Sequence, residues 1–448
     1  MISFLHPAAA LGTLGLFCLA SAANAQSPFF PDNATIDYAL QNPYAVVGYA
    51  NNTGYKNKTG GTSPTVTLAS GGSVYSLSVC NRSIFNVAGG SAYYLYAYDA
   101  STVNVSSGVV KYTLELHNNS AVNITGGEVG GIIAYDTSKV SISGAIIGSV
   151  YTHDNTVSNI NSNNVGSLFA SNTSTVNINS AVRGDLRADD NSTVNVTGGS
   201  VGNRLFSDAS GTLNISGNVN APLVQSMYKG TVNVNGLSGS ELDAYGTSVI
   251  NFRAGALQNY LVANNSSQVN LSGGSVGQVV VTYNTSALNM TGGACNYLDG
   301  YDKSVINFRG GNIRSSLNVF NNSTANITGG GIAGSLNAYD NSVINVSGGN
   351  LGDIAAYNSS CINIFGTGLS DALTNPRIFY NGHLFSVYLL SGTLRDGTLL
   401  TGNQFYIAVE SGTGAKFTLN AAVPEPGAFA FLAGAAGAGI SLFRQRRK

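Results

Sequence analysis

The feature that most constrains this chain is a short motif, Val-x-Asn-Val, that returns at a nearly fixed interval. In one copy it reads Val-Ile-Asn-Val over residues 343–346, and its Asn recurs in fifteen successive steps of 18 or 19 residues. These positions are Asn86, Asn104, Asn123, Ser141 as the one substitute, Asn159, Asn177, Asn195, Asn214, Asn233, Asn251, Asn270, Asn289, Asn307, Asn326, Asn345 and Asn363. The interval predicts stacked repeats in place of the two or three globular domains that 448 residues would otherwise suggest.

The residues around the repeated Asn alternate in the manner of a strand. Val122 and Ile124 flank Asn123, which places the two apolar side chains on one face and the Asn on the other. Every turn carries an aliphatic residue nine positions before the Asn, and Gly-Gly pairs such as Gly126-Gly127 separate the strands. The pattern predicts an all-β, single-stranded parallel β-helix (β-solenoid) over residues 65–371, with about 16–17 turns of 18–19 residues. The mixture of 18-residue and 19-residue turns favours the right-handed form of the β-helix.

The repeat is similar in length, and in its Val-Asn-Ile/Val and Gly-Gly pattern, to the β-helices of filamentous-haemagglutinin-like and other secreted adhesins. Outside the repeat, residues 26–64 are expected to cover its first turn, because an open stack exposes strand edges and apolar core. Residues 372–422 leave the period and are rich in aromatics. We expect a C-terminal cap there, with strands at 385–390, 405–409 and 416–419.

The N-terminus has the pattern of an export signal. An apolar run over residues 8–20 is followed by Ala23-Asn24-Ala25, a sequence that signal peptidase accepts, so residues 1–25 are predicted to be removed.

The C-terminus carries a second targeting pattern over residues 423–448. Pro424, Glu425 and Pro426 precede an uncharged, mostly apolar stretch over 428–443 and a basic tail. This order resembles the sorting signal of the PEP-CTERM proteins. The resemblance implies a Gram-negative host, transient anchoring of 428–443 in the inner membrane, processing by an exosortase-type enzyme near the Pro-Glu-Pro motif, and delivery to the cell surface or extracellular matrix.

Composition excludes several other classes of function. Charged residues make up 9% of the chain, and the solenoid has no basic face, so nucleic acid is not an expected partner. Cys80, Cys295 and Cys361 lie in different turns and are read as isolated small apolar residues. No nucleophile elbow, phosphate loop or metal-ligand spacing occurs, so neither a cofactor nor a metal is expected.

The outward Asn column is the first candidate surface. With the hydroxyl residue two positions later, as in Asn345-x-Ser347, it could bind polysaccharide or an ordered lattice such as ice or mineral. The favoured explanation is structural: stacked Asn side chains hydrogen-bond along the solenoid and stabilise it.

An aromatic column six positions before the Asn is the second candidate. Exposed aromatics stack on sugar rings, so its tyrosines are the preferred carbohydrate contacts, while the alternative is that they only cover the corner. They are Tyr98, Tyr135, Tyr245, Tyr283, Tyr301, Tyr339 and Tyr357.

The third candidate is the one charge cluster of the solenoid. Asp185, Arg187 and Asp189 lie in one turn, and Asp208 lies in the next. Right-handed β-helix enzymes that cleave pectin-like polymers place such residues on adjacent turns, and paired carboxylates can act as acid and base. The favoured reading is an exposed ion-pair group, in which Arg187 is a natural partner for the carboxylates.

Taken together, the sequence predicts an exported, exosortase-processed surface or matrix protein, a structural and adhesive rod that contacts extracellular polysaccharide and is not an enzyme. The alternative is a polysaccharide-active lyase or hydrolase on the same fold.

Overall fold

The computed structural model describes residues 34–36, 45–47, 65–380, 382–400 and 405–421. The chain divides into two compact units, Met1–Gly202 and Asn203–Lys448. Within the described residues each unit is built from β-strands that stack as parallel coils, and the coils number about 16 in all. The predicted parallel β-solenoid is therefore confirmed, while its right-handed winding stays a prediction.

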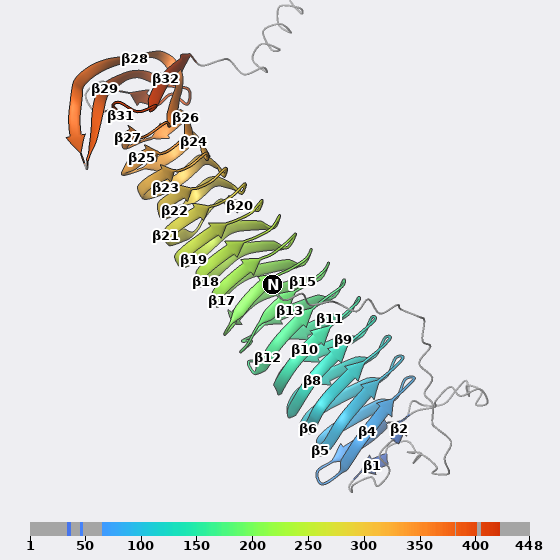
Figure 1. Cartoon of the computed structure of the whole chain (residues 1–448). Helices are drawn as coiled ribbons and strands as arrows, with labels where there is room; N and C mark the ends of the chain where they lie inside the picture. The colour runs from blue at the N-terminus through green and yellow to red at the C-terminus, as the bar shows by residue number, and fades with distance from the viewer. Residues whose placement is uncertain (1–33, 37–44, 48–64, 381, 401–404, 422–448) are drawn as a thin grey trace, which may run out of the picture. The chain divides into compact units, whose positions relative to one another are not determined.

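Within the described part of the chain, the N-terminal unit contains strands β1 to β15 (Figure 1). They are β1 (Ala34–Ile36), β2 (Ala45–Val47), β3 (Thr65–Ala69), β4 (Ser73–Val79), β5 (Ile84–Ala97), β6 (Thr102–Leu116), β7 (Ala121–Ile124), β8 (Glu128–Ala134), β9 (Lys139–Ile142), β10 (Ile146–Thr152), β11 (Val157–Ile160), β12 (Val165–Ala170), β13 (Thr175–Asn179), β14 (Leu186–Ala188) and β15 (Thr193–Ser200).

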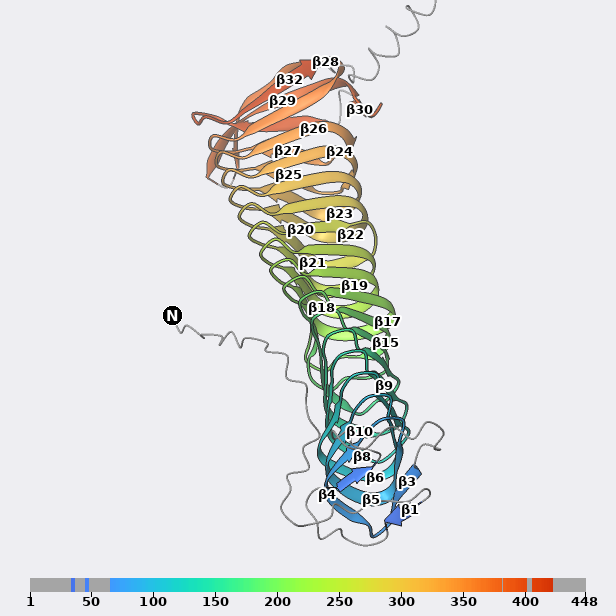
Figure 2. The same cartoon turned by 90° about the vertical axis from the view of Figure 1, so that its right-hand side faces the viewer.

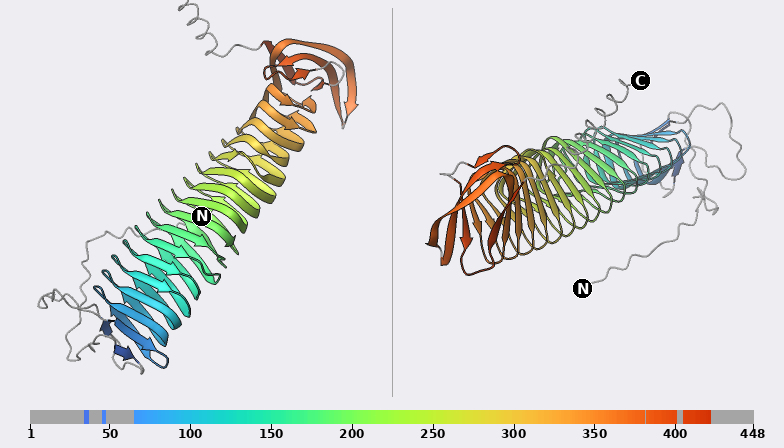
Figure 3. Two further views of the ribbon diagram at one scale, coloured as in Figure 1. Left: turned by 180° about the vertical axis from the view of Figure 1, so that it is seen from behind. Right: turned by 90° about the horizontal axis from the view of Figure 1, so that it is seen from above.

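The C-terminal unit contains the remaining strands, and Figure 3 shows their stacking from behind. They are β16 (Arg204–Ser207), β17 (Thr212–Ser226), β18 (Thr231–Ala244), β19 (Val249–Ala263), β20 (Gln268–Leu271), β21 (Ser275–Thr282), β22 (Ala287–Gly300), β23 (Val305–Val319), β24 (Thr324–Ile332), β25 (Ser335–Ala338), β26 (Val343–Asn350), β27 (Asp353–Ala356), β28 (Cys361–Tyr380), β29 (His383–Leu394), β30 (Leu399–Leu400), β31 (Tyr406–Glu410) and β32 (Lys416–Ala421).

Strand register follows the sequence period. Asn104 of β6 pairs with Asn123 of β7 in parallel, and Asn270 of β20 pairs with Asn289 of β22 in the same way. Equivalent residues of successive turns therefore lie directly above one another, so each sequence column becomes a line of side chains along the coil axis.

The inward columns form an aliphatic core in each unit. In β25 and β26, Leu336, Ala338, Ile344 and Val346 are all 0% exposed, as the alternation predicts, whereas Val343 lies outside this set. In Gly-Gly pairs such as Gly126-Gly127 and Gly348-Gly349 the second glycine has a positive φ, 82° at Gly127 and 100° at Gly349, a conformation that residues with a Cβ rarely adopt. Cys80 and Cys295 are buried and Cys361 is half-buried, and none of the three forms a disulfide within the described residues.

A C-terminal cap closes the last turns with a mixed sheet. β28 and β29 form an antiparallel hairpin whose pairing begins at Gly366 and Leu394, while β31 and β32 add in parallel to β27 and β28. Figure 2 shows β28, β29 and β32 together over β26 and β27. The three strands expected in this segment are confirmed as β29, β31 and β32. The export signal, the sorting signal and most of the N-terminal cap lie outside the described residues.

Candidate functional site

The aromatic column of the N-terminal unit is a stack of parallel rings. Tyr98, His117, Tyr135 and His153 follow one another with centroid distances of 5.0, 5.1 and 4.9 Å and interplanar angles of 9–13°. All four side chains are half-buried. Because each inner ring lies between two others, a ligand reaches ring edges and hydroxyl groups here more readily than ring faces.

The C-terminal unit repeats this arrangement over five turns. Tyr283, Tyr301, Phe320, Tyr339 and Tyr357 stack with successive centroid distances of 5.2, 4.7, 4.7 and 4.5 Å. Burial, together with the adjacent Tyr357, raises the pKa of Tyr339 to about 12. The structure therefore brings four of the candidate tyrosines into one continuous stack, with Phe320 as the fifth ring.

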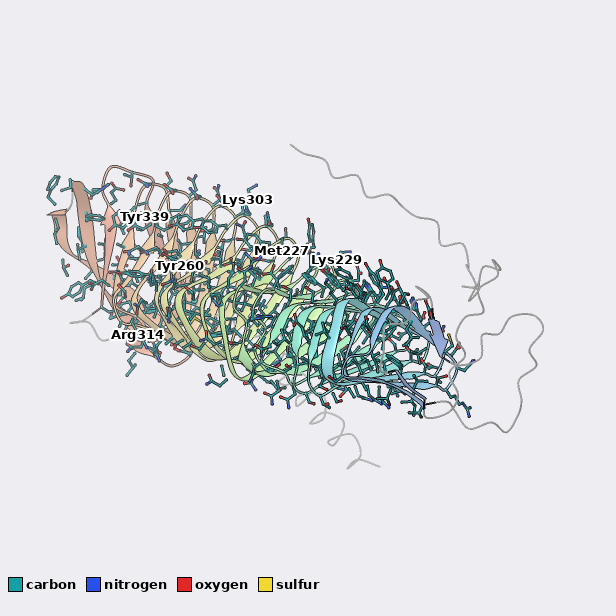
Figure 4. All side chains as sticks on the ribbon, turned by 90° about the horizontal axis from the view of Figure 1, so that it is seen from below. Met227, Lys229, Tyr260, Lys303, Arg314 and Tyr339 are labelled. Carbon is teal, nitrogen blue, oxygen red and sulfur yellow. The ribbon has the colours of Figure 1, made fainter. Side chains whose placement is uncertain are left out.

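Tyr245 stands apart from that stack, since Met227 and Asn264 occupy its column in the neighbouring turns. Its pKa is raised by burial and by the nearby Asp243, a carboxylate that is 6% exposed and accepts a hydrogen bond from the Tyr245 hydroxyl. Among labelled side chains of this unit, Lys229 and Lys303 lie along one edge and Arg314 along the opposite edge (Figure 4). These cations are spread over two edges and do not form one basic face.

The residue after each aromatic turns the chain. In most turns it is an Asp or Asn with φ between 52° and 62°, a region that these two residues tolerate better than other residues with a Cβ. Its backbone N–H donates to the side-chain oxygen of the equivalent residue one turn later, as from Asn118 to Asp136 at 2.7 Å and from Asn284 to Asp302 at 2.9 Å. These Asp and Asn side chains therefore hold the corners together, as a turn role predicts.

A buried serine column was missed by the sequence reasoning. In several turns the serine hydroxyl three positions before the Asn donates to a backbone carbonyl of the preceding turn, as from Ser286 to Ala263 at 3.1 Å and from Ser360 to Ala338 at 3.1 Å. Both of these serines are 0% exposed. The hydroxyl groups of Ser101, Ser120, Ser138 and Ser342 lie in the same column but have no hydrogen-bond partner among the described residues. Its sequence signal is the return of Ser at the same interval, which could have been found by reading one more column.

The outward Asn column forms amide ladders. In the N-terminal unit Asn104 Nδ2 donates to Asn86 Oδ1 at 2.9 Å, and in the C-terminal unit Asn345 donates to Asn326 at 2.9 Å. Thr67 accepts from Asn86 at one end, and Thr418 of the cap donates to Asn363 at the other end of the C-terminal ladder. An amide inside a ladder thus uses one donor and one acceptor, as Asn104 and Asn345 do, which is what the structural explanation requires.

The single Ser in the Asn column allows a direct test. We expect Ser141→Asn to raise the stability of the N-terminal unit by about 0.5–1.5 kcal/mol, because the new amide can donate to Asn123 and accept from Asn159. Thermal unfolding of parent and variant measures the change. The matched control is Ser143→Asn, a substitution two positions further along the chain and outside the ladder. This variant should not raise the stability of the N-terminal unit. An unchanged melting temperature for Ser141→Asn would contradict the stabilising role of the ladder.

The charge cluster contains a close ion pair. Arg187 Nε lies 2.6 Å from Asp189 Oδ1, with the two side chains 33% and 23% exposed. Asp185 belongs to the same N-terminal unit, whereas Asp208 lies in the C-terminal unit and accepts a hydrogen bond from the backbone N–H of Ala209 at 2.7 Å. Arg187 therefore neutralises one of the candidate acid–base carboxylates, as expected of an ion-pair group.

Two cap carboxylates accept hydrogen bonds from backbone N–H groups of the last turns. Glu410 Oε2 accepts from the backbone N–H of Asn358 at 2.6 Å, the donor that pairs with Asp or Asn in other turns, and Asp396 accepts from Gly349 at 2.7 Å. Burial alone would raise the pKa of Glu410, but the bond from Asn358 and the adjacent His383 outweigh it and hold the pKa below its usual value. The pKa of Asp396 is lowered in the same way by backbone N–H groups of Thr398 and Gly349.

These lowered pKa values predict an acid-sensitive cap. A carboxyl whose pKa is lower in the folded protein than in the unfolded protein stabilises the folded state fully when the pH is above the unfolded-state pKa. This contribution is lost as the pH falls through the folded-state pKa. We expect the backbone amides of Asn358 and Gly349 to lose hydrogen-exchange protection when the pH falls below the ordinary pKa values of Glu and Asp, which are 4.5 and 3.8.

The control for this prediction is Glu410→Gln, which removes the titrating group while keeping its shape. The variant should show weaker protection of Asn358 at neutral pH and less further loss in acid. Equal acid-induced loss at Asn358 in parent and variant would contradict the role of Glu410.

The described ranges offer no further recognisable centre. They contain no group of three or more His, Cys, Asp or Glu side chains placed to hold a metal ion, and no helix long and apolar enough to cross a membrane. A shallow depression on the N-terminal unit is lined by uncharged residues, among them Ser143, Asn161, Ser162 and Asn163.

No family model, curated protein or solved structure matches the chain. Any assignment of function therefore depends on the chain's own chemistry.

Proposed function

We propose that this chain is an exported protein of the cell surface or extracellular matrix, which acts as a structural and adhesive scaffold and contacts extracellular polysaccharide. The observation that carries the proposal is how the outward columns are used. Asn amides pair with one another, aromatic rings stack on one another, and corner Asp and Asn side chains bind backbone N–H groups of neighbouring turns. A surface whose side chains mostly stabilise the coil suits a scaffold.

Delivery to the surface is proposed on the sequence of the two ends. Residues 1–25 would be removed by signal peptidase, and 428–443 would hold the chain in the inner membrane until an exosortase-type enzyme processes it near Pro424, Glu425 and Pro426. Mass spectrometry of the mature protein tests this. Cleavage near the motif, lost in a Pro424→Ala/Pro426→Ala variant, supports the proposal, and a mature protein that retains residues 427–448 refutes it.

Polysaccharide contact has its own test. The purified chain is applied to a glycan array and to immobilised extracellular polysaccharide, with the heat-unfolded chain as control. Retention of the folded chain alone supports adhesion, and no retention on any polymer refutes the contact.

A polysaccharide-active enzyme is the second candidate, and it rests on the charge cluster of Asp185, Arg187, Asp189 and Asp208 in a chain of which 9% of the residues are charged. The ion pair between Arg187 and Asp189 weighs against it, because it neutralises one of the carboxylates. Cleavage of acidic polysaccharide by the parent, lost in Asp185→Ala, Asp189→Ala and Asp208→Ala variants, would favour the enzyme. Absence of cleavage by the parent would remove it.

A further inference from the structure

Four tyrosine side chains from successive turns meet on the N-terminal unit and form what we call the tyrosine cluster. Tyr75 comes from β4, Tyr93 and Tyr94 from β5, and Tyr112 from β6. Tyr93 lies 5.4 Å from Tyr75 and 5.8 Å from Tyr112, measured between ring centroids. Tyr94 lies 5.7 and 5.2 Å from the same two rings. Each β5 tyrosine therefore contacts both outer tyrosines, and the four rings form one closed group.

The rings of the tyrosine cluster are arranged differently from those of the aromatic columns. Their interplanar angles are 30–67°, against 9–13° in the column of the same unit. Tyr75 is 49% exposed and Tyr112 is 46% exposed. A tilted, half-exposed group leaves ring surface open to solvent, and an exposed aromatic patch of this kind is a feature of binding surfaces.

The next turn leaves the outer side of Tyr112 uncovered. Tyr75, Tyr93 and Tyr112 share one column, and the following residue in that column is Gly130. A Cβ at Gly130 would lie 2.7 Å from the carbonyl oxygen of Tyr112, so the next turn approaches by its backbone and adds no ring. The tyrosine cluster therefore ends here with an open edge.

Lys111 adds a positive charge to the tyrosine cluster. It lies in a 19-residue interval, where the pairing of β6 with β8 shifts register between Val110 and Thr113. Its Nζ lies 5.0 Å from the centroid of Tyr93 and 5.5 Å from that of Tyr112, and the side chain is exposed. The described residues provide it with no carboxylate partner. An exposed ammonium group over two tyrosine rings complements a ligand that carries negative charge, while the half-exposed rings of the cluster offer apolar contact.

We propose that the tyrosine cluster, together with Lys111, is a binding site for an acidic polysaccharide. Sugar rings present C–H faces that stack on tyrosine, their hydroxyl groups hydrogen-bond the phenol oxygens, and a uronic-acid carboxylate pairs with Lys111. The column of Tyr75, Tyr93 and Tyr112 repeats once per turn, which suits a polymer of repeating rings. This inference depends on the proposed contact with polysaccharide and assigns it to a place other than the stacked aromatic columns.

The test measures binding of the full chain to polygalacturonate, as an acidic probe, and to dextran, as a neutral probe, by affinity electrophoresis at low and high salt. We expect the parent to prefer polygalacturonate and to bind it less tightly as salt rises. Tyr75→Ala/Tyr112→Ala should weaken binding by about tenfold or more, and Lys111→Glu by a similar factor. Tyr75→Phe/Tyr112→Phe should retain most of the affinity, because the rings remain.

Tyr301→Ala is the matched control, because it removes a tyrosine from the stacked column of the C-terminal unit and should leave binding unchanged. A parent that binds neither probe nor any array polysaccharide would refute both the proposed contact and this site. A parent that binds while the cluster variants bind equally well would overturn the site alone. Equal binding of both probes, unaffected by Lys111→Glu, would overturn the acidic class. Circular dichroism of each variant confirms that it is folded.

Discussion

Replacement of Phe308 by alanine is expected to lower the free energy of unfolding of the C-terminal unit by about 3–5 kcal/mol. Phe308 is 0% exposed and pairs in register with Met290 and Ile327 of the adjacent turns. Its ring fills the space beside Gly330, where an added Cβ would lie 2.5 Å from Phe308 Cζ. Since the coil on either side is held by its own ladder, it cannot close fully over the lost ring, and a cavity adds to the lost burial.

Denaturant unfolding followed by circular dichroism, with hydrogen exchange to locate the opening, measures this effect. The matched control is Phe379→Ala, the same substitution at a residue of the cap hairpin that is 74% exposed, and it should change stability by less than about 0.5 kcal/mol. Equal losses in the two variants would show that burial of Phe308 does not dominate the stability of this unit.

Substitution of Gly148 by alanine should destabilise the N-terminal unit by about 1–3 kcal/mol or more. A Cβ at Gly148 would lie 1.9 Å from the carbonyl oxygen of Gly130 in the preceding turn. The clash is with backbone, so no side-chain rotation relieves it, and the turns must separate. We expect loss of amide protection in the turns on both sides of the substitution.

Gly131→Ala is the control for this prediction. The nearest atom to a Cβ at Gly131 is the carbonyl oxygen of Tyr112, 3.6 Å away, which is ordinary van der Waals contact. The two glycines lie in the same unit and neither has a positive φ, so the comparison isolates the close approach of the turns. If both variants melt at the same temperature, the spacing of turns at this corner is not limited by Gly148.

Most of the turn was predictable from sequence because its residues return in register. The Leu and Ala that precede each motif, and the apolar residues that flank its Asn, are buried where the alternation placed them, as Leu336 and Val346 show. The ladder explanation of the Asn column also follows from the period, since equal spacing in a parallel stack puts one amide above the next. The buried serine column returns at the same interval, so it could have been predicted in the same way.

The candidate sites were less predictable. The sequence indicated that Tyr339 and its equivalents line one corner, but whether their rings point outward or stack on one another depends on side-chain rotation about a fixed backbone spacing. The tyrosine cluster was missed because its members combine two columns, and because Lys111 belongs to the extra residue of a longer turn. Glu410 lies 52 residues from Asn358, so no local pattern connects them.

The sequence by itself determined the parallel solenoid, its inward columns and the positions of its corners, because a fixed period converts local alternation into a repeated contact between neighbouring turns. Only the tertiary structure decided which outward side chains contact the neighbouring turns and which remain exposed to solvent. That distinction depends on ring tilt, register shifts and contacts with the cap, which are set by packing in three dimensions and leave no periodic trace in the chain.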